Sequence, residues 1–147
     1  MNANELVGLL NNNLSDLQVL YVKLHNYHWN VKGIYFKSIH EMTESYYEYF
    51  ATQYDDVAER IAQLGGKPLA SMKSYLGNAS LKEEDGNNFD AKYVLKSVLA
   101  DFDALNIKYQ DISKAAGENN DAPTANIADE NITWLQKQIW MIKAMLA

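Results

Sequence analysis

The sequence predicts an all-α protein, a bundle of four long helices with one long crossover connection between the second and the third. Apolar residues recur every three or four positions over four separate long stretches, which is the period of a helix with one buried face. The segment between the second and third stretches is far too long for a hairpin turn. Together these two observations favour a four-helix bundle with one long crossover.

The composition indicates one folded domain, expected to span residues 1–147. Hydrophobic residues make up 48% of the chain, so disorder is not expected. No apolar run is long enough for a membrane span and the first residues lack the pattern of a signal peptide, which predicts a cytoplasmic protein. The absence of cysteine excludes disulfides and thiolate metal sites. A formal charge of −6 favours cations over polyanions as ligands.

The first two helices are expected to form a hairpin. The first is predicted over residues 4–30, where an apolar stripe continues to His28. The second is predicted over residues 36–64, and the glycines that follow it, Gly65 and Gly66, favour a helix stop. The sequence therefore places the end of one helix and the start of the next on either side of a tight turn.

The remaining elements follow a connection over residues 65–89, which contains a possible short helix around residues 71–76. A helix of about 28 residues is about 42 Å long, and this connection can cross that length, so the second and third helices can run parallel. The third helix is predicted over residues 90–116, with Asp90 as its N-cap and Gly117 as its end.

The fourth helix is predicted from Pro123, a residue favoured at the first helical position, to Met145. Acidic residues lie near its start, and Asp121 there can be explained by the helix dipole alone.

Possible metal ligands lie on the second helix, on a face separate from its core face. His40, Glu44, Asp55 and Glu59 fall within roughly 100° of one another on a helical wheel. A solvated acidic face is the ordinary explanation of such a row. The i,i+4 spacing of His40 with Glu44, and of Asp55 with Glu59, favours metal binding instead, because side chains so spaced can reach a single ion.

The ligands divide into two groups. His28 and His40 are expected to be neighbours across the turn, whereas Asp55 lies roughly 22 Å from His40 along the helix. If the groups cooperate, Asp55 and Glu59 must come from a second copy that runs antiparallel across a two-fold axis, giving two equivalent sites per dimer. A mixed set of nitrogen and oxygen ligands suits iron or zinc.

Three segments at fixed spacing resemble the Dps family of mini-ferritins, named for DNA protection during starvation. They are His28-Trp29-Asn30, His40-Glu41, and the segment from Asp55 to Arg60 followed by Gly65-Gly66. The resemblance covers essentially the whole chain. It implies a ferritin-like four-helix bundle in which the crossover carries a short helix.

The resemblance also implies a ferroxidase site shared between two subunits, holding two irons or one tight and one loose. His28, His40 and Glu44 are then ligands from one subunit, and Asp55 and Glu59 are ligands from its two-fold partner. The implied assembly is a homo-oligomer, a dodecamer built from two-fold dimers that encloses a hollow shell.

Trp29 is expected beside the metal pair, although a tryptophan at a helix end can equally be a core residue. Glu44 departs from the aspartate that is more usual in the family. Its longer side chain can still reach an ion, directly or through water.

The start of the fourth helix is implied to line three-fold pores of the shell. Asp121 and Asp129 are the candidate pore residues. Asn126 stands where many family members carry a pore aspartate, so the negative charge is expected to be weaker here or shifted to those two positions.

The leading hypothesis for function is iron storage and detoxification by a ferroxidase. The resemblance implies hydrogen peroxide as the preferred oxidant, dioxygen as a slower one, and ferric mineral stored in the shell as protection against oxidative stress. The alternative is a DNA-binding protein that protects the nucleoid and has minor ferroxidase activity. The first lysine is Lys23 and the last is Lys143, so neither end offers a basic tail and little DNA binding is expected. A third hypothesis is a shell whose site is vestigial or filled with zinc.

Overall fold

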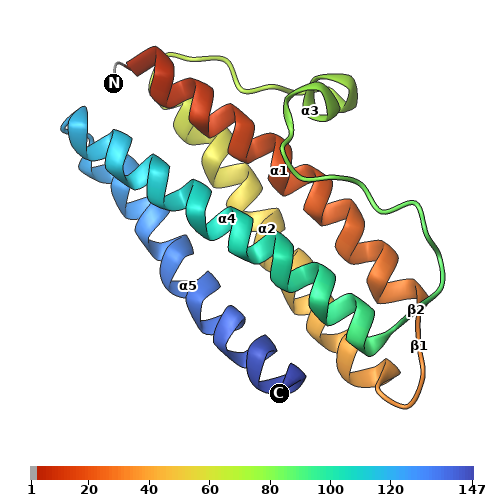
Figure 1. The fold of residues 1–147 in the computed structure, drawn as a ribbon. Coiled ribbons are helices and arrows are strands. Elements are labelled where there is room, and N and C mark those ends of the chain that lie inside the picture. The colour runs from red at the N-terminus through yellow and green to blue at the C-terminus, as the bar shows by residue number, and fades with distance from the viewer. Residues whose placement is uncertain (1–2) are drawn as a thin grey trace.

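The computed structural model describes residues 3–147 and contains, within that range, four long helices, one short helix and two short strands (Figure 1). The helices are α1 (Ala3–Asn30), α2 (Phe36–Gln63), α3 (Met72–Asn78), α4 (Ala91–Glu118) and α5 (Ala122–Leu146), and the strands are β1 (Val31–Lys32) and β2 (Phe89–Asp90). This is the predicted ferritin-like bundle, with the short helix in the crossover. Residues 1 and 2 of the predicted domain lie outside the described range.

The four long helices form two hairpins joined by the crossover. α1 and α2 pack side by side in opposite directions, as do α4 and α5, whereas α2 and α4 run in the same direction (Figure 1). The crossover carries α3 along α1 and returns to the end of the bundle where α2 began. The structure therefore confirms the prediction that the second and third long helices run parallel.

The glycines after α2 end the helix as predicted. Gly65 has a φ of 84°, a left-handed conformation that glycine adopts without a steric cost. Its N–H donates to the carbonyl of Ala62, and the N–H of Gly66 donates to the carbonyl of Ile61, both at 3.0 Å. These bonds satisfy carbonyl groups that the helix end would leave unpaired.

The second hairpin differs from the prediction at its turn. Gly117 does not end the third long helix, because α4 continues to Glu118 and the left-handed residue is Asn120, with a φ of 55°. Pro123 is the second residue of α5 rather than the first. Asp90 is the N-cap of α4 as predicted, since its carboxylate accepts a 2.8 Å hydrogen bond from the N–H of Tyr93.

One hydrophobic core runs through the bundle. α2 turns its apolar stripe into this core, and the centre is aromatic, with the rings of Phe50 and Phe102 5.6 Å apart. Trp134 of α5 stacks on Tyr49 of α2 with ring centroids 3.8 Å apart. These contacts fix how α2 is rotated about its axis. The face of α2 that carries the candidate carboxylate ligands therefore points away from the core.

The turn between α1 and α2 is tied to the start of α4. β1 and β2 pair in parallel, with Val31 opposite Phe89. The ring of Phe89 also packs edge-on against Tyr27 of α1, at a centroid distance of 5.1 Å. This end of the bundle is thus held by both backbone and side-chain contacts.

The crossover is fastened to α1 and α4 through Glu84. One carboxylate oxygen of Glu84 accepts hydrogen bonds from the hydroxyls of Tyr27, at 3.0 Å, and Tyr93, at 2.6 Å. Lys23 of α1 also forms a largely buried ion pair with Asp101 of α4, with Nζ and Oδ2 2.7 Å apart. The long connection therefore has a specific anchor on the bundle.

Between residues 3 and 147, none of the helices combines the length and the apolar character that crossing a bilayer requires.

Candidate metal centre

His28 and His40 are locked together across the turn between α1 and α2. Nδ1 of His28 lies 2.6 Å from the backbone carbonyl oxygen of His40, and Nδ1 of His40 lies 2.7 Å from the carbonyl oxygen of His28. The two rings stack with centroids 3.6 Å apart and planes 12° apart. His28 is buried and His40 is half-buried.

These crossed bonds determine which nitrogen of each ring is free. A carbonyl oxygen only accepts hydrogen bonds, so Nδ1 must carry the proton in both rings. In the neutral imidazoles of His28 and His40, Nε2 then keeps its lone pair. An imidazole whose Nδ1–H is bonded to a carbonyl is the usual arrangement of a histidine metal ligand. The pair therefore fits a transition metal ion without any change of tautomer.

The hydroxyl of Thr43 contacts the histidine pair. This hydroxyl is fully buried, lies 3.4 Å from Nδ1 of His28, and lies 2.8 Å from the carbonyl oxygen of Ile39 and 3.1 Å from that of His40. The ring of Phe36 stacks on that of His40, with centroids 5.0 Å apart. Thr43 and Phe36, both on α2, thus contact the histidine pair.

Glu44 lies one turn after His40 on α2 and is exposed. The hydroxyl of Tyr47 donates a hydrogen bond to its Oε1 at 3.4 Å. The i,i+4 spacing of His40 and Glu44 places both side chains on one face of the helix. Trp29 is 67% exposed, and its ring lies 5.4 Å from that of His25, which stands one turn before it on α1. It is therefore a surface tryptophan in this subunit and not a core one.

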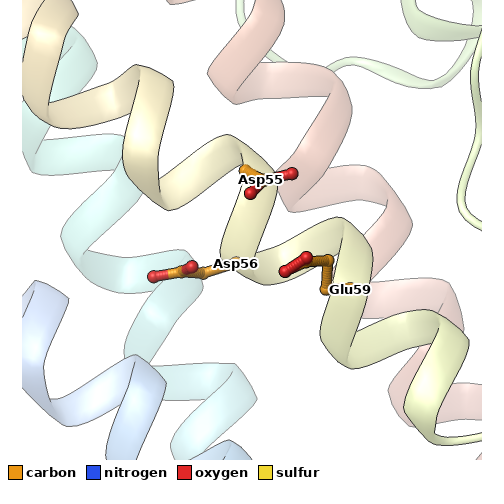
Figure 2. A group of neighbouring side chains, drawn as sticks. All are labelled: Asp55, Asp56 and Glu59. Carbon is orange, nitrogen blue, oxygen red and sulfur yellow. The ribbon is translucent and has the colours of Figure 1, made fainter.

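The second candidate group lies farther along α2 and consists of Asp55, Asp56 and Glu59 (Figure 2). Each of these exposed side chains offers an oxygen within 4.8 Å of the others. Asp56 was not predicted as part of this group, although its i,i+3 spacing to Glu59 could have indicated it. Carboxylates so close together repel one another, and a cation relieves that repulsion.

The comparisons with known proteins agree with this fold. A family model for the ferritin-like domain matches residues 7–147. The DNA protection during starvation protein of Helicobacter pylori is 41% identical over 133 residues, which cover 90% of this chain and 92% of that protein. The chain belongs to the Dps family.

Solved Dps structures superpose closely on the whole chain. A Dps protein from Bacillus brevis is 35% identical, with a TM-score of 0.95 and full coverage of both chains. A Dps protein from Vibrio cholerae, placed in a broad superfamily of ferritin-like diiron-carboxylate proteins, is 32% identical with a TM-score of 0.95. That match covers 99% of this chain and 91% of the other.

The two acidic residues predicted to line Dps pores are both bonded within the subunit. Asp121 is the N-cap of α5, and its carboxylate forms an ion pair with Arg60, with Nη2 and Oδ1 2.8 Å apart. Asp129 accepts a 2.6 Å hydrogen bond from the hydroxyl of Ser113. Their pore role stays a prediction, and of the two only Asp121 has its charge balanced by a neighbouring cation.

Within one Dps subunit, the rings of His28 and His40 are in contact and Glu44 follows one turn later on α2. Among the described residues, the side chains that could hold an ion together are Asp55, Asp56 and Glu59, farther along the same helix. The fifteen-residue separation of His40 and Asp55 corresponds to roughly 22 Å of helix. A single subunit therefore does not bring the two groups to one ion. Their union across a two-fold axis stays a prediction.

Proposed function

We propose that this Dps protein oxidises Fe(II) at sites between paired subunits and stores the ferric product in the shell they build. The observation that carries the proposal is the crossed bonding of His28 and His40, which leaves both Nε2 atoms free as ligands. A metal-ligating histidine usually donates its other ring N–H to a carbonyl, a carboxylate or water, and both rings of this pair are bonded in that way.

The proposed site combines ligands of two kinds. His28 and His40 supply neutral nitrogens, Glu44 supplies a carboxylate, and Asp55 and Glu59 of the two-fold partner supply two more. Carboxylates stabilise Fe(III) more than Fe(II), because the higher charge interacts more strongly with anionic oxygen. Ligation by several carboxylates therefore favours oxidation of the bound substrate iron.

Hydrogen peroxide is the proposed oxidant, with dioxygen as a slower one. Two Fe(II) ions each lose one electron, and peroxide takes up those two electrons with two protons and leaves as two waters. Removing Fe(II) and peroxide together prevents their reaction in solution, which would form hydroxyl radicals. The proposed role is thus protection against oxidative stress as well as iron storage.

The partner arrangement follows from the geometry of α2. A two-fold axis that brings Asp55 and Glu59 of one subunit to the histidine pair of another does the reverse at the same time, so each pair of subunits completes two sites. We propose that such pairs assemble further into the dodecameric shell of the family. The protein is then a homo-oligomer in which assembly and activity are coupled.

The test is a rapid-mixing experiment on the assembled protein. Metal-free protein is loaded with Fe(II) without oxygen and mixed with peroxide, and ferric absorbance is followed. The variant that combines His28→Ala with Asp55→Ala is expected to lose the fast phase. Glu41→Ala is the matched control, since Glu41 is an exposed carboxylate on the same helix that faces Lys37 at 3.9 Å.

Two outcomes contradict the proposal. Equal rates in the double variant and the wild type mean that iron is oxidised elsewhere. Absence of a fast phase in the wild type itself, with zinc retained after purification, supports a shell with a zinc-filled site instead.

A further inference from the structure

Tyr47 of α2 packs against one member of the histidine pair. Its ring meets that of His28 edge to face, with centroids 5.3 Å apart and planes at 88°. Its hydroxyl donates to Oε1 of Glu44 at 3.4 Å. One side chain thus touches two of the three candidate ligands that this subunit supplies.

Glu44 needs such a contact more than the histidines do. His28 and His40 are fixed by their bonds to backbone carbonyls, whereas Glu44 is exposed and has three rotatable bonds. An exposed glutamate samples many rotamers, and only some of them turn the carboxylate toward the histidine nitrogens. A hydrogen bond from a fixed donor restricts that sampling.

Tyr47 is itself fixed by a neighbour on α1. The ring of His25 stacks on it, with centroids 3.8 Å apart and planes at 21°. Nδ1 of His25 lies 2.8 Å from the backbone carbonyl oxygen of Tyr21, so this nitrogen carries the proton and the ring is held in one orientation. The ring of Tyr21 packs edge-on against both, at 4.6 Å from His25 and 5.9 Å from Tyr47.

We propose that Tyr47 is a positioning residue that keeps the carboxylate of Glu44 on the side of α2 where the histidine pair lies, and that His25 holds Tyr47 in place. This inference rests on the proposed function, because it assigns Tyr47 a role at the same site. It also assigns a role to His25, for which the sequence alone gave no indication.

A packing role alone makes a different prediction. Tyr47→Phe keeps the ring, and with it the contacts to His25 and His28, but removes the hydrogen bond to Glu44. If Tyr47 only fills space, this variant binds metal as the wild type does. If Tyr47 positions Glu44, metal affinity falls, because the carboxylate must be ordered when the ion binds.

The probe is Co(II) added to the metal-free assembled protein, since its visible absorption reports the ligand set and binding is measured without any oxidation. Wild type, Tyr47→Phe and Glu44→Gln are titrated alongside Tyr21→Phe. The last is a matched control, because it keeps the ring packing and the backbone carbonyl that holds His25. Thermal unfolding of each variant checks that the bundle is intact.

Tyr47→Phe is expected to weaken Co(II) binding about tenfold, the size of effect typical when a residue that orients a metal ligand is lost. Tyr21→Phe is expected to match the wild type. The double variant of Tyr47→Phe with Glu44→Gln is expected to bind no more weakly than Glu44→Gln alone, because the two changes remove one interaction.

Wild-type affinity and spectrum in Tyr47→Phe overturn the inference while leaving the proposed site intact. Additive losses in the double variant overturn it as well, since Tyr47 then acts independently of Glu44. Co(II) binding that is unchanged by His28→Ala overturns the proposed site itself, and the role of Tyr47 with it.

Discussion

Arg60 near the end of α2 is bound to Asp121 at the start of α5, with Nη2 and Oδ1 2.8 Å apart. Nε of the same guanidinium donates to the hydroxyl of Thr124 at 2.8 Å. Asp121 in turn accepts from the N–H of Thr124 at 3.1 Å, so it caps α5 while it pairs with α2. The single arginine of the chain therefore joins the two hairpins of the bundle.

Substitution of Asp121 is expected to destabilise the bundle through two separable effects. Asp121→Ala removes both the helix cap and the partner of a partly buried arginine, and should lower the free energy of unfolding by about 2 kcal/mol. Asp121→Asn can still cap the helix and should cost less. Urea unfolding of both variants measures the difference. Equal losses would show that the cap contributes nothing, and wild-type stability in Asp121→Asn would show that the ion pair contributes nothing.

The stability contributed by Asp121 should depend on pH. Burial acts to raise the pKa of this carboxyl, but hydrogen bonds from Thr124 and the pairing with Arg60 outweigh burial and lower the pKa below 3.8. A lowered pKa adds stability that is present above the value of the unfolded chain and is lost as the pH falls through the folded value. Asp121→Asn should flatten the stability curve below about pH 4.

Glu84 should give the crossover its own sensitivity to acid. The hydrogen bond from Tyr93 is the main reason that the pKa of Glu84 falls below its ordinary 4.5, with smaller help from Gly86 and Tyr27. Because the folded pKa of Glu84 is lowered, its contribution to stability is complete above pH 4.5 and is lost as the pH falls through the folded pKa. Amide hydrogen exchange should therefore accelerate in residues 79–88 before it accelerates in α1 or α4.

Glu84→Gln is the control for this prediction. Its side-chain oxygen still accepts from the two tyrosines but does not titrate, so the difference in exchange between neutral and acidic pH should shrink. Equal acceleration in the variant and the wild type would show that some other group opens the crossover.

Mixed subunits test whether the proposed site is shared. His28→Ala and Asp55→Ala each damage both sites of a homodimer, but a mixed dimer has one site with both changes and one with neither. Random pairing of equal amounts, after unfolding and refolding together, should restore about a quarter of wild-type ferroxidase activity. Activity no higher than the mean of the two separate variants would place all ligands within one subunit.

DNA binding is expected to be weak. The formal charge of −6 opposes association with a polyanion. Only the release of counterions from the DNA, where lysines contact its phosphates, could offset that repulsion. A gel shift with linear duplex DNA should show no saturable retardation at moderate salt. Retardation that persists there would favour the alternative function in nucleoid protection.

The helix boundaries show what a sequence pattern can predict. The apolar period located every long helix to within a few residues, because burial of one face repeats along the chain. Glycine was less informative, since Gly65 takes a left-handed φ of 84° and ends α2, whereas Gly117 stays inside α4. The difference depends on the bonds that the following residues find, and Asn120 provides the left-handed turn instead.

At the metal centre, too, the sequence predicted one part of the geometry and not another. Spacing across a tight turn was enough to predict that His28 and His40 are neighbours. The crossed bonds to their carbonyls, and the stack of His25 on Tyr47, depend on how two helices are rotated against each other. No pattern within a single helix encodes that rotation, so the contact of His25 with Tyr47 could not be predicted from the sequence.

The pairing of Val31 with Phe89 bears on the order of folding. The hairpin of α1 and α2 closes through contacts near in sequence, whereas β1 meets β2 only after the crossover has travelled back along the bundle. Closing so large a loop has a high entropic cost, and contacts of this range slow folding. We expect the imidazole pair to be assembled early, and the strand bridge beside it to form among the last steps.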